Sequence, residues 1–306
     1  MAETARKYNI IPNVYKNSPY CMSVNDNIFP KEMDDRFKKM FLNGNGNELD
    51  GKACALHSSS MLAFNFFYWI DETHPFEMDG YKFTKAYFEV QLPTLQGSTP
   101  ANMDVVLEGK DVLLFIESKF TEHFSNANSQ MKKMLDSSYC KRNSRYKYYY
   151  HNAQNFSNWE SLIKDFATLS EGSDGYYDGI KQEICHLIAL TNLKHDEKVR
   201  EDYEKRYEVS EETERVDHPT ITGNETFLFY NVLFDPEDNY EESNCFKNYK
   251  EDLYEKLEKE LEDNKLGWVK NDITMKIKSY RDIFEKIPDT ADVKHYLEQR
   301  YMNFSK

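Results

Sequence analysis

A continuous apolar run that stops in a cluster of charges is the strongest restriction on the fold of this 306-residue chain. Val112 to Ile116 contains no polar residue, and the next three residues are Glu117, Ser118 and Lys119. An apolar run without alternation is typical of a central strand that is covered on both faces. Because an unpaired buried charge costs several kcal/mol, Glu117 and Lys119 need polar partners where this strand ends.

The segments around this run predict an ordered series of elements. The expected elements are a buried helix (56–70), strands (82–92, 102–107 and 111–120) with a tight turn at 108–110, a helix (175–192) and a strand (225–234). The order of helix, three strands, helix and strand indicates an α/β or α+β fold with a central mixed sheet flanked by helices.

Three charged residues are expected to meet at one edge of this sheet. Glu117 and Lys119 are two residues apart, so their side chains point to the same face of a strand. Asp104 lies on the neighbouring strand, across the tight turn. Two carboxylates are suitable ligands for Mg²⁺, which activates a bound water, and an ammonium group stabilises charge that develops on a phosphate. The pattern therefore favours phosphodiester hydrolysis; the alternative is a surface ion pair between Glu117 and Lys119.

Asp104, followed thirteen residues later by Glu117-Ser118-Lys119, resembles the D…(D/E)-x-K signature of the PD-(D/E)XK nuclease superfamily, which has the restriction-endonuclease-like fold. Met103 stands where the proline of the signature would be. The predicted order of elements is similar to the core of that family over roughly residues 55–235. The segments HSSSMLAFNFF and DVLLFIESKFTE also resemble uncharacterised bacterial members.

The resemblance implies a role for each matching position. Asp104 and Glu117 would be metal ligands for Mg²⁺ or Mn²⁺, with the backbone carbonyl of Ser118 as a third ligand, and Lys119 would be the catalytic lysine. Glu89 would supply a further carboxylate; the alternative is a solvated strand residue. Gln182 would stand beside the site, with His186 where such members usually carry a tyrosine; the alternative is hydrogen bonding along the helix face.

A basic and aromatic segment follows the E-x-K strand. Between Met131 and Asn152 the only acidic residue is Asp136. The cations are Lys132, Lys133, Lys141, Arg142, Arg145 and Lys147, interleaved with Tyr139, Tyr146, Tyr148, Tyr149 and Tyr150. Cations contact phosphates and aromatic rings stack on unpaired bases, so we expect this segment to bind nucleic acid, with DNA as the expected partner. The alternative is a solvated loop whose tyrosines pack on the domain.

The net charge of −14 does not oppose this interpretation, because the acidity is local. Residues 196–263 hold 23 of the 53 acidic but only 9 of the 39 basic residues, so the rest of the chain is neutral. Within this acidic region, 194–224 is expected to be an exposed helix or a flexible arm, and 249–263 an amphipathic helix. A last strand and helix are expected within 273–287.

The expected organisation has three parts: an N-terminal extension (1–52), a nuclease-like core (53–235) with the basic and aromatic insertion (121–172), and a C-terminal helical elaboration packed on the core (236–306). No apolar run reaches the ~18 residues that cross a bilayer, and the N-terminus lacks the apolar core of a signal peptide. The five cysteines form no C-x-x-C pair, so a reducing cytoplasm is expected.

Two other functions compatible with this sequence are a catalytically inactive nuclease fold that binds nucleic acid or serves as a scaffold in a defence or repair complex, and an interaction protein whose acidic helices dock a basic partner. A homodimer is compatible with the sequence as well.

Overall fold

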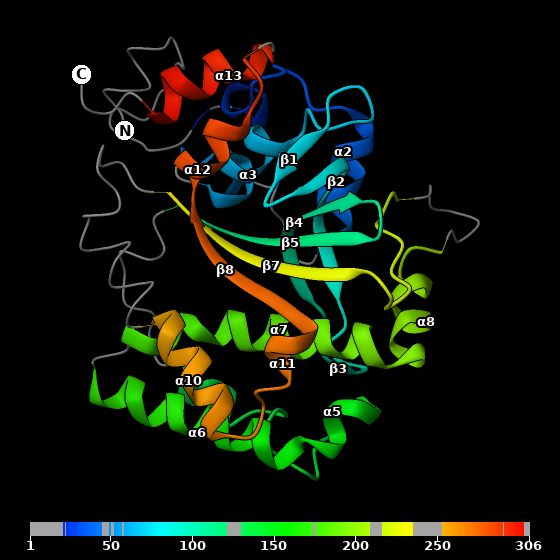
Figure 1. Ribbon diagram of the computed structural model, residues 1–306. Helices are drawn as coiled ribbons and strands as arrows, with labels where there is room; N and C mark the ends of the chain where they lie inside the picture. Colours follow the sequence, from blue (N-terminus) through cyan, green and yellow to red (C-terminus); the bar gives the residue numbers. More distant parts are fainter. Residues whose placement is uncertain are drawn as a thin grey trace.

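A mixed six-stranded sheet forms the centre of the protein in the computed structural model (Figure 1). The structure describes residues 21, 23–44, 49, 52–56, 58–120, 130–173, 176–208, 216–234, 253–289 and 291–302. The strands are β1 (Phe76–Met78), β2 (Tyr81–Leu92), β4 (Ala101–Gly109), β5 (Val112–Lys119), β7 (Thr226–Leu233) and β8 (Ile273–Ser279), in the order β1-β2-β4-β5-β7-β8.

The sheet confirms the predicted fold class and order of elements. β2, β4 and β5 form an antiparallel meander, and β7 and β8 continue the sheet parallel to β5. A parallel pair needs a crossover connection, and α7 (Ile180–His195) lies in the one between β5 and β7. β8 lies within the C-terminal part of the chain, so this part contributes an edge strand as well as helices.

β5 is the buried central strand that its sequence predicts, since all eight of its residues are buried between β4 and β7. The turn before it lies at Lys110 and Asp111, later than the predicted 108–110, because Glu108 and Gly109 still pair with β5. Asp111 has a left-handed φ of 57°. Glycine is required at position 109 because a Cβ atom there would collide with the backbone carbonyl of Lys82 on β2.

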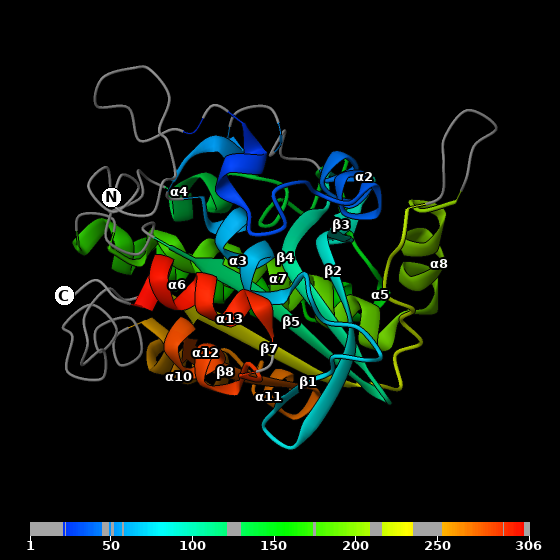
Figure 2. The same ribbon diagram turned by 90° about the horizontal axis from the view of Figure 1, so that it is seen from above.

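One face of the sheet is covered by α3 (Ser59–Phe67), together with α12 (Tyr280–Lys286) and α13 (Asp292–Leu297) from the other end of the chain (Figures 1 and 2). α3 is buried on nearly all sides, as its apolar sequence predicts, and its N-cap is Ser58, whose side chain accepts the Met61 N–H. A further helix near the N-terminus, α2 (Asp35–Asn43), packs against β2.

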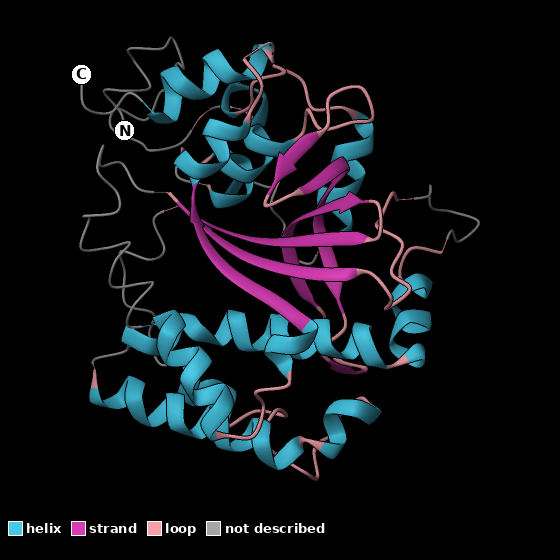
Figure 3. Ribbon diagram, viewed as in Figure 1, coloured by secondary structure: helices cyan, strands magenta, loops and turns pink. Residues whose placement is uncertain are grey.

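The other face is covered by α7, with α6 (Phe156–Gly172) and α10 (Glu255–Asp263) behind it (Figure 3). The sequence interpretation missed α6, although its buried Trp159, Leu162, Ile163 and Phe166 follow helical spacing. The remaining elements of this half are α4 (Gln130–Leu135), α5 (Tyr150–Gln154), α11 (Val269–Asp272), the single-turn η4 (Tyr176–Gly179) and the two-stranded sheet of β3 (Leu95–Gln96) and β6 (Lys147–Tyr148).

The acidic region contains two helices within its described residues. α8 (Glu197–Lys205) begins at Asp196, whose side chain caps it, and buries Val199 and Tyr203. α8 therefore packs on the protein and is not the exposed helix or flexible arm expected within 194–224. Residues 209–215 and 235–252 lie outside the described ranges. Three short turns complete the chain: η1 (Val24–Asn27), η2 (Lys52–Cys54) and the π-turn η7 (Glu298–Met302). Within the described residues, no helix combines the length and the apolar character needed to cross a bilayer.

Candidate active site

Glu117 and Lys119 form a buried ion pair at the carboxyl end of β5. The Nζ atom of Lys119 donates to Oε1 of Glu117 at 2.7 Å, and the two residues are only 6% and 3% exposed. Ser118, between them, points to the opposite face, where its Oγ atom donates to the Ser59 carbonyl and contacts the Tyr280 hydroxyl. The pair thus faces α7, and it is not the surface ion pair that the alternative interpretation required.

Asp104 joins this pair because β4 separates from β5 at this point. The pairing of the two strands ends at Val105 and Ile116, and the next position along the register sets Asp104 opposite Glu117. The Oδ2 atom of Asp104 accepts the backbone N–H of Ser118 at 2.7 Å, where a strand carbonyl would otherwise accept it. Asp104, Glu117 and Lys119 are therefore brought together, as their spacing predicted.

Glu89 continues the same row onto β2. The pairs on either side of it, Phe88 with Val105 and Val90 with Met103, set Glu89 opposite Asp104. Its φ of 51° is left-handed, which is costly for a residue with a Cβ atom and is found most often at functional sites. Its carboxylate accepts hydrogen bonds from Ser60 Oγ at 3.1 Å and Asn102 Nδ2 at 3.0 Å. Glu89 is 4% exposed, so it is not a solvated strand residue.

Gln182 and His186 approach the pair from α7. Gln182 accepts a hydrogen bond from Lys119 Nζ, and His186 Nε2 lies 3.0 Å from Glu117 Oε2. They are one helical turn apart, so both side chains reach β5 from the same face of α7. Gln182 is exposed and His186 is buried. The cluster therefore meets solvent near Gln182 and is closed at its base by His186.

A family model described as "restriction endonuclease associating with ARP" matches residues 4–302 of the chain. The chain belongs to this restriction-endonuclease family. Searches of the curated proteins and of the solved structures found no match. The family match spans every residue of the cluster and agrees with the fold.

The surroundings of Asp104 and Glu117 shift the pKa values of these two facing carboxyl groups in opposite directions. Burial and the charges of Glu117 and Glu89 raise the pKa of Asp104 well above its usual value. Burial alone would also raise the pKa of Glu117, but Lys119 and His186 outweigh it and lower that pKa to about 2. The surrounding carboxylates raise the pKa of Lys119 despite its burial. The site therefore combines a firmly ionised Glu117 with an Asp104 whose charge is only partly compensated by Lys119 and the Ser118 N–H.

The donor set at this site fits a magnesium ion. In the described part of the chain, no group of three or more His, Cys, Asp or Glu side chains is arranged to hold a metal. Mg²⁺ does not need such a group, because it is commonly bound by one or two carboxylates and keeps several waters. Asp104 and Glu117 provide the two carboxylates. The Ser118 carbonyl points toward β4 and Asp104, since a strand residue directs its N–H and C=O to the same neighbour.

The interpretation of the sequence missed three polar residues around the cluster. Ser60 and Asn102 hold Glu89, and Asn231 on β7 pairs in register with Glu117, so it extends the row across the sheet. Asn231 is fully buried. An asparagine in the middle of the apolar strand FLFYNVLF is a signal that this position faces polar groups.

The basic segment is exposed as predicted, but not all its tyrosines are. All six cations, from Lys132 to Lys147, are exposed, whereas Tyr148 and Tyr149 are 5% and 1% exposed. The Tyr148 hydroxyl donates a hydrogen bond to the Tyr139 carbonyl, and the Tyr149 hydroxyl donates one to Asp202. These two rings therefore pack on the domain and do not present a stacking surface. The alternative interpretation holds for Tyr148 and Tyr149; Tyr150 is 73% exposed.

Proposed function

We propose that this chain is a metal-dependent nuclease of the PD-(D/E)XK type that hydrolyses DNA phosphodiester bonds. The observation that carries the proposal is the convergence of Asp104, Glu117 and Lys119 where β4 and β5 separate. Membership of a restriction-endonuclease family supports both the chemistry and DNA as the substrate. The contact of Gln182 with Lys119 adds support, since the resemblance placed that glutamine beside the site.

Each residue of the cluster has a role in this chemistry. Asp104, Glu117 and the Ser118 carbonyl would hold Mg²⁺ or Mn²⁺, and the bound ion would supply an acidified water and neutralise phosphate charge. Lys119, held by Glu117 and Gln182, presents a fixed ammonium group that stabilises negative charge as it develops on the phosphate. Glu89 increases the negative charge around Asp104, which strengthens the attraction for a cation.

We also propose that the core comprises residues 53–235, including the insertion at 121–172, with residues 1–52 and 236–306 as additions to it. Support comes from the strands that carry the cluster, which all lie within the core. The C-terminal addition supplies β8 to the same sheet, and so it is proposed to be needed for folding.

The proposal is tested by incubating the protein with single-stranded, duplex and flapped DNA in Mg²⁺, Mn²⁺ or EDTA. We expect cleavage with either ion and none with EDTA, because the cluster lacks a nucleophile that acts without a metal-activated water. Cleavage in EDTA would contradict the proposal. Absence of cleavage with every substrate, together with no heat of Mn²⁺ binding by calorimetry, would contradict it as well.

An inactive nuclease fold that binds nucleic acid or acts as a scaffold is the second candidate. One observation favours it: both carboxylate oxygens of Glu117 already have partners, Lys119 on Oε1 and His186 on Oε2. Each oxygen keeps a further lone pair, so these bonds do not exclude a metal. Calorimetry separates the two candidates, because an inactive fold has no requirement for Mn²⁺.

His186 is expected to act as a positioning residue for Glu117. The variant His186→Ala removes the partner of Oε2, and loss of such a partner typically lowers metal affinity or activity about 10- to 100-fold. We therefore expect slower cleavage and a higher half-saturating Mn²⁺ concentration, measured in a Mn²⁺ titration. His218→Ala is the matched control, because His218 bonds Glu204 at the same 3.0 Å away from the cluster. An unchanged Mn²⁺ requirement in His186→Ala would refute this role.

The cations of the basic segment are expected to bind the DNA backbone. Lys141, Arg142, Arg145 and Lys147 form no ion pair with any described residue, so their charges are available to phosphates. Replacing all four by alanine should weaken DNA binding. It should also make the slope of log binding constant against log salt concentration shallower, by about 0.9 for each phosphate contact to duplex DNA that is lost. Fluorescence anisotropy between low and high salt measures both. The same affinity and slope as wild type would exclude this surface.

A further inference from the structure

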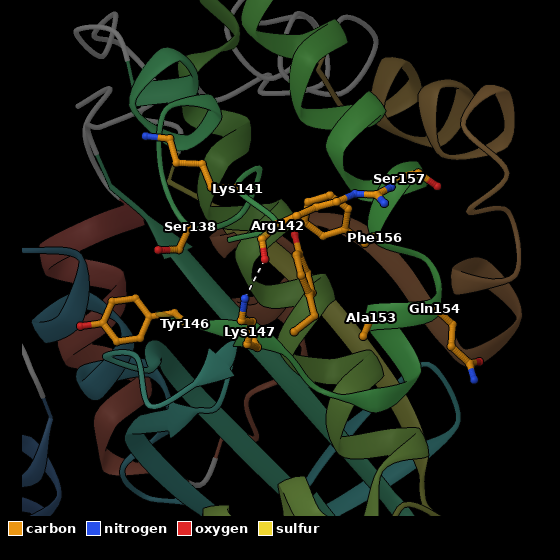
Figure 4. A pocket seen from close by; sticks show the side chains of 10 residues that line it. Ser138, Lys141, Arg142, Tyr146, Lys147, Ala153, Gln154, Phe156 and Ser157 are labelled. Atoms are coloured by element: carbon orange, nitrogen blue, oxygen red, sulfur yellow. Dashed lines mark hydrogen bonds between the residues drawn. The ribbon is translucent and has the colours of Figure 1, made fainter. Parts of the chain in front are cut away.

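A pocket lies between the basic segment and the start of α6 (Figure 4), and none of its lining residues belongs to the Asp104 cluster. Its volume is about 400 Å³, within the range of about 300 to 1,000 Å³ that is typical of sites for small ligands. One wall comes from the loop between α4 and β6, and the other from the end of α5 and the start of α6. The residues that matter most are Lys141, Arg142, Tyr146, Lys147, Gln154 and Phe156.

The cations of this pocket are held in place by neutral groups. Lys147 Nζ donates to the Arg142 carbonyl at 2.6 Å, and Lys141 Nζ donates to the Asp136 carbonyl. A carbonyl orients an ammonium group without cancelling its charge. No described carboxylate pairs with Lys141, Arg142 or Lys147, so the pocket has three uncompensated positive charges around its rim. Such a rim attracts an anion, and a phosphate in particular.

Planar groups provide the second half of the pocket. The guanidinium of Arg142 lies over the Phe156 ring at 5.2 Å, and this ring in turn contacts the buried Tyr148 edge to face at 5.6 Å. A supported stack of this kind offers a flat face to a nucleobase, since bases stack on arginine planes as well as on aromatic rings. Gln154 is exposed at the same wall and carries both a donor and an acceptor for a base edge.

The pocket-bearing segment begins beside the Asp104 cluster. Lys181 donates to Gln130 at 3.2 Å where α7 meets α4, and the next residue, Gln182, contacts Lys119. α4, the first element of this segment, therefore lies next to the part of α7 that carries Gln182.

We propose that this pocket binds a single unpaired nucleotide of the DNA, with its phosphate on Arg142, Lys141 and Lys147 and its base against the Arg142–Phe156 stack. The proposal rests on the proposed nuclease function, to which it adds a preference for DNA with an unpaired nucleotide. A paired base cannot enter, because the pocket is the size of one nucleotide and its flat face replaces a neighbouring base in the stack.

Binding to three labelled DNAs tests the pocket. They are a paired duplex, the same duplex with one unpaired nucleotide, and the same duplex with an abasic site at that position. Anisotropy is measured in EDTA, which prevents cleavage. We expect wild type to bind the unpaired nucleotide about tenfold more tightly than either of the other two, since base stacking has effects of this order. Arg142→Ala and Phe156→Leu should reduce the preference to less than about twofold.

Lys132→Ala is the control, because Lys132 is an exposed cation of the same segment that pairs with Glu171 at 3.4 Å and does not line the pocket. It should change the affinity for the three DNAs by the same factor and keep the preference. Thermal melting of each variant verifies that it is folded. Equal binding of the three DNAs by wild type would overturn the proposal. Binding of free dAMP without a preference among the DNAs would also overturn it, and would indicate a free nucleotide as the ligand.

The outcomes separate this proposal from the nuclease itself. Metal-dependent cleavage with no preference for the unpaired nucleotide would overturn the pocket and leave the nuclease. A preference that disappears in Arg142→Ala, in a protein that cleaves no DNA with any metal, would support the pocket and overturn the nuclease.

Discussion

Replacing Lys119 by methionine is expected to reduce metal-dependent DNA cleavage by a factor of about 100 to 1,000. Removal of one fixed group that stabilises transition-state charge typically has an effect of this size. Methionine matches the lysine side chain as far as Cε and lacks the ammonium group that donates to Glu117 and Gln182. The initial rate of cleavage in Mg²⁺ measures the effect, and a rate within threefold of wild type would remove Lys119 from the mechanism.

The same variant should lose stability, which requires a control. Glu117 is 3% exposed, and removing one partner of a buried ion pair costs about 3 to 5 kcal/mol because the other charge is left without compensation. The double variant Glu117→Gln/Lys119→Met removes both charges, so it should recover most of the stability and remain inactive. Recovered stability would show that the loss in Lys119→Met comes from the uncompensated charge of Glu117. Because Glu117 is itself a proposed metal ligand, the role of Lys119 in cleavage is judged on the single variant.

Lys85→Met is the matched control, because it makes the same substitution at a lysine of the same sheet that lies outside the cluster. Lys85 on β2 pairs with Glu108 at the same 2.7 Å, but its side chain is 44% exposed. Exposed pairs contribute about 0 to 1 kcal/mol, so this variant should be close to wild type in stability and cleavage. Equal loss of cleavage in the Lys85 and Lys119 variants would show that the effect is not specific to the cluster.

The variant Asp104→Asn is expected to lose metal-dependent cleavage and to become more stable at neutral pH without metal. Asparagine keeps an oxygen that can accept the Ser118 N–H, but it removes a negative charge that faces Glu117 and Glu89. Loss of a carboxylate that is proposed to bind the metal should abolish Mn²⁺ binding in calorimetry. Relief of the repulsion should raise the melting temperature, by about 2 to 4 °C for each kcal/mol in a domain of 150–250 residues.

The pH dependence follows from the raised pKa of Asp104. Between the pKa of Asp104 in the unfolded chain, about 3.9, and its higher value in the folded protein, the folded state binds more protons. The contribution of Asp104 to stability therefore decreases as pH rises through this window. The variant lacks this contribution, so its advantage in melting temperature should be greatest at neutral pH and disappear below pH ~4. A variant that is less stable than wild type at neutral pH would contradict the charge arrangement described above.

Local sequence patterns were sufficient to predict strands β2, β4, β5, β7 and β8 and the centre of the site, but not the short strands β1, β3 and β6. The apolar run of β5, its hairpin with β4 and the helix α3 all follow from the order of apolar and polar residues along short segments. The two-residue spacing of Glu117 and Lys119 fixes their common face, and the hairpin brings Asp104 opposite them. These relations depend on neighbours in sequence, so no knowledge of distant contacts was needed.

Tertiary structure alone decided how the cluster is completed. The contact of His186 with Glu117 joins residues 69 positions apart, and it depends on how α7 packs across the sheet. The left-handed φ of Glu89 is stabilised by hydrogen bonds to its carboxylate from α3 and β4. The burial of Tyr148 and Tyr149 follows from their contacts with Tyr139 and Asp202.

The pocket belongs to this second group, because one wall comes from a loop and the other from the ends of two helices, and their separation is set by packing. The sequence by itself thus determined the long strands and the row of Asp104, Glu117 and Lys119, since strand periodicity and a short hairpin fix these positions locally. Only the tertiary structure decided which side chains surround that row, because contacts between distant segments depend on how the helices fill the two faces of the sheet.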